Sequence, residues 1–109
     1  MISTDYEEKY LKMLKEIILS QVDTEKVMVF VFGSRASTKY SSRADVDIGL
    51  LTDGKLPYNL FHKIRNAVDE SIIPWEIDLV DFTRVTKSFK EAALKDILIW
   101  NKPKVMKKN

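Results

Sequence analysis

Apolar positions along the chain follow two different periods, and each period predicts one type of element. Between residues 5 and 21 the apolar side chains recur at helical spacing among glutamates and lysines, which predicts an amphipathic helix. Residues 27–32 form an unbroken apolar run, mostly β-branched and aromatic, and this pattern indicates a strand buried on both faces. Gly33 and Ser34 then turn the chain, with only a weak helical turn after them.

Strand-like alternation returns at residues 45–51 and ends among turn-forming residues up to Pro57. The apolar residues of the next segment, from Leu60 to Ile72, mark a second helix. It should end near Pro74, because the residue before a proline is disfavoured in the α region. Residues 76–82 then predict a third strand.

The last segment leaves two options open. Thr86 or Ser88 could cap a final helix that runs to about Asp96 and buries Phe89, Ala93 and Leu94. Residues 97–100 either continue this helix or form a short edge strand. We expect one domain over residues 1–101, followed by a lysine-rich tail over 102–109. Helices and strands that alternate without a linker predict a single α/β domain.

Composition narrows the function classes. The 109 residues carry 18 basic and 16 acidic side chains in a mixed distribution, so the net charge of +2 does not indicate a nucleic-acid binder. The absence of cysteine excludes disulfides, thiolate metal sites and thiol nucleophiles, and a reducing cytoplasm is the expected setting. No stretch approaches the roughly 18 consecutive apolar residues of a membrane span, so we expect a soluble protein.

Acidic residues stand where strands usually avoid them. Asp45 and Asp47 are two apart on a predicted strand, so both side chains should leave the same face of the sheet. Two carboxylates about 4 Å apart repel each other by about 4 kcal/mol at an effective dielectric constant near 20. Asp78, in the third strand, could bring a third carboxylate there, and Asp81 is the competing candidate. Three positions along a strand reverse the face, so both cannot point at the site, and we choose Asp78 because it lies deeper in the apolar run. Three hard oxygen ligands favour Mg²⁺ or Mn²⁺ and a phosphate-bearing substrate.

The turn after the first strand has the outline of a phosphate cradle. Gly33 and Ser34 leave backbone N–H groups and a hydroxyl free to meet an anion. Ten residues separate Ser34 from the Asp45-x-Asp47 pair, and such a string should arise by chance in a chain of this length about once in a thousand. The spacing therefore favours a shared site over an ordinary turn.

These motifs resemble those of the DNA polymerase β-like nucleotidyltransferase superfamily, and specifically its minimal nucleotidyltransferase (MNT) members. Residues 32–36 are similar to the family's F-G-S-R-A, residues 45–48 to its D-x-D-[LI], and residues 76–81 to the strand with the third carboxylate. The resemblance covers essentially residues 10–100. It implies a small mixed β-sheet with flanking helices.

The resemblance also implies roles for individual residues. Asp45 and Asp47 would bridge two Mg²⁺ ions, and Asp78 would hold the ion that activates the attacking hydroxyl. The substrate would be a nucleoside triphosphate, with ATP as the expected one. Its phosphates would meet the turn and nearby basic side chains, namely Gly33, Ser34, Arg35, Lys39 and Arg43.

The same resemblance points to a partner and leaves alternatives open. MNT proteins usually act on a separately encoded helical HEPN protein, often a ribonuclease toxin, by binding it or by moving AMP onto a tyrosine. The family usually has glycine where Thr38 stands and serine where Ala44 stands. A second hypothesis is therefore a binding module that neutralises its partner without catalysis. A third is a nucleotidyltransferase for a small molecule such as an aminoglycoside. Nucleobase, acceptor residue and oligomeric state stay open.

Overall fold

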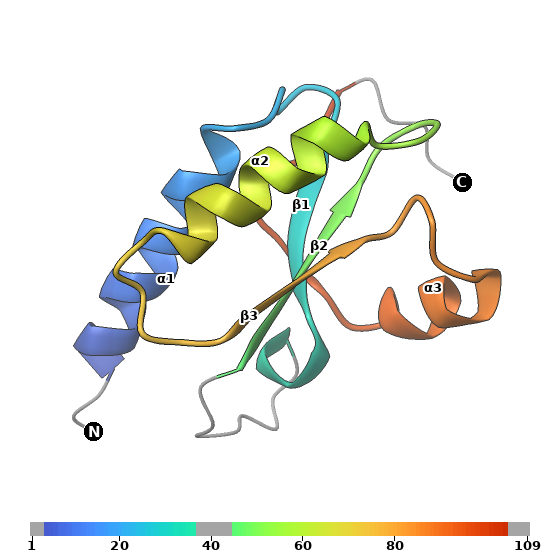
Figure 1. Cartoon of the computed structure of the whole chain (residues 1–109). Helices are drawn as coiled ribbons and strands as arrows, with labels where there is room; N and C mark the ends of the chain where they lie inside the picture. The colour runs from blue at the N-terminus through green and yellow to red at the C-terminus, as the bar shows by residue number, and fades with distance from the viewer. Residues whose placement is uncertain (1–3, 37–44, 105–109) are drawn as a thin grey trace.

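The computed structural model of the protein describes residues 4–36 and 45–104, without the side chains of residues 4–6, 34 and 35. Within these described residues, three α-helices, a 3-10 turn and four strands follow one another (Figure 1). In order they are α1 (Thr4–Leu19), β1 (Met28–Phe32), η1 (Gly33–Ala36), β2 (Val46–Leu51), α2 (Tyr58–Asp69), β3 (Ile77–Asp81), α3 (Lys87–Ala93) and β4 (Leu98–Ile99).

The four strands form one mixed sheet in the order β3-β2-β1-β4. β1 is antiparallel to both β2 and β4, whereas β2 and β3 run parallel. The parallel pair requires a crossover, and α2 supplies it between β2 and β3. The predicted fold class, a small mixed sheet with flanking helices, is confirmed.

The two faces of the sheet have different coverings because side chains alternate along each strand. One face carries the main core and packs against α1 and α2, which lie side by side over the sheet (Figure 1). This core includes Val29, Val31, Ile48, Leu50 and Leu79 from the strands, with Leu14, Ile18, Ile64 and Val68 from the two helices. The sheet is thereby anchored from one side.

The opposite face carries a smaller aromatic cluster of Phe30, Phe32 and Phe82. The rings of Phe30 and Phe32 each meet Phe82 edge-on, with centroids 5.0 Å apart in both pairs. Ala93 of α3 and Leu94, which follows the helix, pack against this cluster. The short α3 lies beyond the end of β3 in Figure 1, well apart from the layer of α1 and α2.

The structure resolves both options that the sequence left open at the end of the chain. Thr86 caps α3, since its side chain accepts a hydrogen bond from the backbone N–H of Phe89. Residues 98 and 99 form the edge strand β4 instead of extending the helix. Phe89 was expected to be buried, but 42% of it is exposed because it lies at the margin of the aromatic cluster.

The second helix ends earlier than predicted. α2 stops at Asp69 instead of near Pro74, and Ile72 is 70% exposed. The Ser71 hydroxyl donates to the carbonyl of Val68 at 2.6 Å and accepts from the N–H of Ile73 at 3.4 Å. These side-chain bonds offer the backbone an alternative to the helical pattern. In the described ranges 4–36 and 45–104, no helix combines the length and the apolar character needed to cross a membrane.

Candidate active site

The three predicted aspartates line one pocket at the start of the parallel strand pair. Asp47 of β2 and Asp78 of β3 are direct neighbours in the sheet register, so their side chains leave the same face. Asp45 stands one residue before β2. The pocket has a volume of about 390 Å³, and Arg65, Glu76 and Ile77 complete its described lining. Because Phe32 pairs with Asp47, this face is the one that carries the aromatic cluster.

The environment of this pocket perturbs Asp47. The pKa of Asp47 is raised above its usual range, chiefly by burial. The negative charges of Asp78 and Asp45 add to the rise, and a side-chain interaction with Asp78 contributes least. The charged form of Asp47 is therefore destabilised, first by burial and then by the neighbouring negative charges. A cation bound between the carboxylates would offset this destabilisation.

The turn after β1 faces the same carboxylates. Gly33 adopts a φ of +77°, a backbone conformation that glycine tolerates and other residues rarely adopt. A side chain at this position would collide with the Asp47 carboxylate, so the carboxylate fills the space that the glycine leaves. The turn and the acidic pocket are therefore parts of one site.

The remaining predicted nucleotide contacts are only partly visible. The backbone of Ser34 and Arg35 lies in η1, directly after Gly33, but their side chains are outside the described part of the structure. Lys39 and Arg43, together with the family departures at Thr38 and Ala44, fall in residues 37–44, which lie outside the described residues.

The donor set of the pocket fits Mg²⁺ in kind, although its side chains are not arranged as a finished metal site. Within residues 4–36 and 45–104, no three acidic or histidine side chains form such a ligand cluster. Asp47 and Asp78 instead lie directly opposite each other on the two parallel strands. Mg²⁺ is usually held by one or two carboxylates plus substrate phosphates, and adjacent aspartates beside an anion-binding turn meet that requirement.

Asp81, the competing candidate for the third carboxylate of the site, instead stabilises a turn. It accepts hydrogen bonds from the N–H and the hydroxyl of Thr83, at 2.9 and 2.6 Å, and pairs with Arg84 at 2.6 Å. These contacts hold the turn that follows β3. Asp81 is absent from the described lining of the acidic pocket.

Similarity to known proteins identifies the family of the chain. The family described as polymerase beta nucleotidyltransferase matches residues 7–104 of the chain. The chain belongs to this family. The family and the nucleotidyltransferase class predicted from the sequence are thereby confirmed.

Individual relatives of this nucleotidyltransferase include both sequences and solved structures. A Haemophilus influenzae protein named probable protein adenylyltransferase MntA is 28% identical over 105 residues, which cover 95% of this chain and 90% of the relative. The crystal structure of a toxin–antitoxin with AMP-PNP is similar at a TM-score of 0.57 and 18% identity, covering 85% and 73% of the two chains. A tri-AMPylated Shewanella oneidensis HEPN toxin in complex with MNT antitoxin gives a TM-score of 0.56 at 17% identity, covering 87% and 72%.

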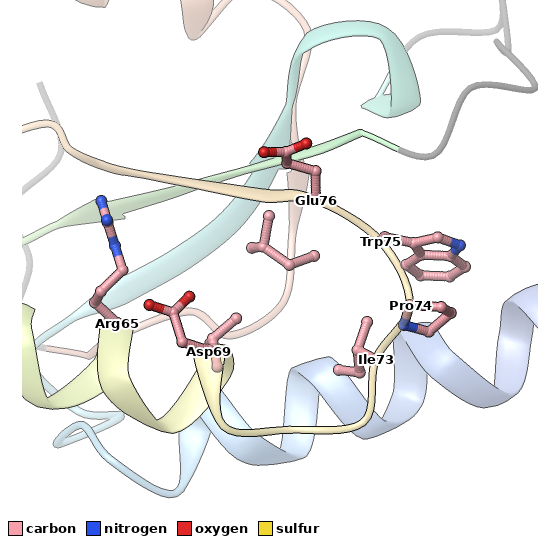
Figure 2. A pocket seen from close by; sticks show the side chains of 8 residues that line it. Arg65, Asp69, Ile73, Pro74, Trp75 and Glu76 are labelled. Atoms are coloured by element: carbon pink, nitrogen blue, oxygen red, sulfur yellow. The ribbon is translucent and has the colours of Figure 1, made fainter.

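Sequence reasoning missed a second hollow of this nucleotidyltransferase, of about 480 Å³, that continues from the acidic pocket. Arg65, Glu76 and Ile77 line both spaces. Figure 2 shows Arg65 and Asp69 rising from α2, opposite Trp75 on the loop that leads into β3. Arg65 is a single exposed helix residue outside every motif, so only the packing of α2 beside β3 reveals its position.

Proposed function

We propose that this nucleotidyltransferase moves AMP from ATP onto a hydroxyl group of a partner protein. The observation that carries the proposal is the register match of Asp47 with Asp78 beside the Gly33 turn, which joins a divalent-cation donor set to an anion-binding bend. The hydroxyl oxygen bonds to the α-phosphorus as the bond to the β-phosphate oxygen breaks, so pyrophosphate leaves.

In this proposal the carboxylates hold metal and the turn holds phosphate. Asp45, Asp47 and Asp78 would hold two divalent ions, Mg²⁺ or Mn²⁺. The ions would supply charge stabilisation at the transferring phosphate, and Asp78 would serve the ion that activates the acceptor hydroxyl. The backbone of Gly33 steadies the β- and γ-phosphates together with Ser34, and the basic residues Arg35, Lys39 and Arg43 neutralise them. The unit that performs this reaction spans residues 1–101, with 102–109 as a basic tail.

A helical HEPN protein, acting as a toxin, is the proposed partner, and this chain is its antitoxin. Two comparisons support the proposal. The Haemophilus influenzae relative is named a protein adenylyltransferase, and one structural neighbour is an MNT antitoxin bound to a HEPN toxin that carries AMP. A tyrosine hydroxyl is the acceptor that the family resemblance favours.

Incubation of the purified chain with its HEPN partner, Mg²⁺ and α-labelled ATP tests the proposal. We expect label on the partner, loss of label with Asp47→Asn, and retention with Asp81→Asn, which makes the same change on the same sheet outside the pocket. A partner that is bound tightly and stays unlabelled would refute the transferase and favour the non-catalytic binding module. Label that appears only on small hydroxyl compounds would favour the small-molecule enzyme.

A further inference from the structure

The hollow of about 480 Å³ beside Arg65 and Trp75 lies across the carboxylates from the Gly33 turn. The turn follows β1, which flanks β2 on one side, whereas the hollow is formed by α2 and the start of β3 on the other side. In an in-line displacement the attacking and leaving oxygens stand on opposite sides of the phosphorus. Because the proposed pyrophosphate leaves at the Gly33 turn, the acceptor hydroxyl should arrive from the side of β3, where the hollow meets the acidic pocket.

The size and the walls of this hollow suit a segment of polypeptide. Ile73, Pro74 and Trp75 form an apolar wall on the loop that leads into β3 (Figure 2). The Trp75 ring meets the Tyr10 ring edge-on with centroids 5.9 Å apart, so it is held in place and offers a packing surface at little conformational cost. A volume of about 480 Å³ lies within the range of pockets that enclose a whole ligand, and it has room for an aromatic side chain together with a neighbour.

The charge of the hollow is negative. Asp69 at the end of α2 and Glu76 just before β3 supply two exposed carboxylates, and Arg65 is the one cation of the described lining (Figure 2). The Arg65 guanidinium lies over the Phe61 ring at 5.5 Å from its centroid. Among residues 4–36 and 45–104, no salt bridge engages either carboxylate. The hollow therefore attracts a cationic group and repels the phosphates of a nucleic acid.

We propose that the hollow receives the acceptor segment of the partner protein and selects a segment in which a lysine or arginine accompanies the acceptor tyrosine. The tyrosine packs along the Trp75 wall and its hydroxyl enters the acidic pocket, while the basic side chain pairs with Asp69 and Glu76. An acidic segment would meet these two carboxylates and the aspartates of the adjoining pocket, and would be repelled. This inference rests on the proposed function and adds the side of entry and the charge of the acceptor segment.

Labelling of the HEPN partner from α-labelled ATP in the presence of a competing synthetic peptide tests the inference. Two peptides of equal length are compared, one with a phenylalanine between lysines and one with a phenylalanine between glutamates. Neither carries a side-chain hydroxyl that could accept AMP. The lysine peptide should inhibit labelling competitively with respect to the partner, about tenfold more strongly than the glutamate peptide. Added NaCl should reduce this difference, because dissolved ions screen exposed charges.

Substitutions at Asp69 separate docking from chemistry, because Asp69 lines the hollow and is absent from the described lining of the acidic pocket. Asp69→Asn should raise the KM for the partner about fivefold at unchanged kcat, the effect of losing one exposed ion pair. Asp69→Lys turns the net charge of the described lining positive, so the glutamate peptide should become the stronger inhibitor. Glu70→Gln is the matched control, because Glu70 is exposed beside Asp69 and outside the described lining.

The outcomes distinguish this inference from the proposed function. An unchanged KM with Asp69→Asn, or labelling that both peptides or neither of them inhibit equally, would overturn the acceptor hollow and leave the transferase intact. A fall in kcat at unchanged KM would assign Asp69 to the chemistry and overturn its docking role. A wild-type chain that labels no partner protein, whether it labels small amino compounds or nothing, would overturn the proposed function, and the acceptor hollow with it.

Discussion

Neutralising Asp47 should stabilise the metal-free protein, although it removes a proposed metal ligand. The pKa of Asp47 is raised by burial and by the charges of Asp78 and Asp45. Two carboxylates about 4 Å apart repel by about 1 kcal/mol in water and about 4 kcal/mol at an effective dielectric constant of 20. Because Asp78 and Asp45 are exposed, solvent screens the repulsion, and the stability gained by removing it lies near the lower value. Asp47→Asn should therefore add about 1 kcal/mol to the free energy of unfolding, or about 5 °C in Tm.

The gain should depend on pH with a defined sign. An aspartate with a raised pKa in the folded state binds its proton more tightly there than in the unfolded chain. The contribution of Asp47 to the free energy of unfolding of the wild-type chain is therefore highest at low pH. It declines as pH rises through the raised pKa. The advantage of Asp47→Asn should be absent at acidic pH, grow across that window and then level off. Thermal denaturation of both variants over a pH series measures it.

Mg²⁺ with ATP should reverse the order of the two proteins. A ligand that binds only the folded state raises Tm, so the wild-type chain should gain stability, whereas Asp47→Asn should gain little. Asp81→Asn is the control for the substitution itself. It weakens the hydrogen bonds to Thr83 and Arg84 and should lower stability by about 1–2 kcal/mol without affecting the metal response. An Asp47→Asn protein that is less stable than wild type at neutral pH without metal would refute the electrostatic account.

Three further substitutions test how the site is supported. Gly33→Ala should cost about 1–2 kcal/mol in thermal unfolding and abolish ATP binding in calorimetry, because its φ of +77° is unfavourable and its methyl group meets Asp47. Gly49→Ala should cost about 1–3 kcal/mol in urea unfolding, since the added methyl group overlaps the Phe30 ring. Asn101→Ala should lower the free energy of unfolding by about 1–3 kcal/mol and reduce the protection of β4 in hydrogen exchange. The reason is that the side-chain amide oxygen of Asn101 accepts a hydrogen bond from the N–H of Val29 at 2.8 Å.

Periodicity and motif spacing predicted the fold because both reflect local rules. The apolar run at 27–32 became β1, and the third predicted strand became β3 with one residue fewer at each end. The relation of Asp47 to Asp78 was also foreseeable. Two strands joined by a crossover helix run parallel in the same sheet, which brings their beginnings to one edge.

Other features depend on packing that no local pattern encodes. The end of α2 was misplaced because Ile72 continues the helical spacing, whereas the Ser71 hydroxyl competes for the backbone. Phe89 was assigned to the core from its spacing, but its burial depends on where α3 meets the Phe32 ring. The hollow beside Arg65 and Trp75 was invisible for the same reason, since its walls come from α2 and the loop that leads into β3.

The carboxylates also help to determine the register of the sheet that displays them. A slip of one residue in β2 or β3 would transfer Asp47 or Asp78 to the face packed against α1 and α2. That face is apolar, and an unpaired carboxylate there would be far more costly than the mutual repulsion it has in the native site. The positions of Asp47 and Asp78 therefore exclude strand registers shifted by one residue, although in the native register the two carboxylates repel each other. Replacing both aspartates with leucine should remove this exclusion, and hydrogen exchange in β3 should then lose protection even if the melting temperature rises.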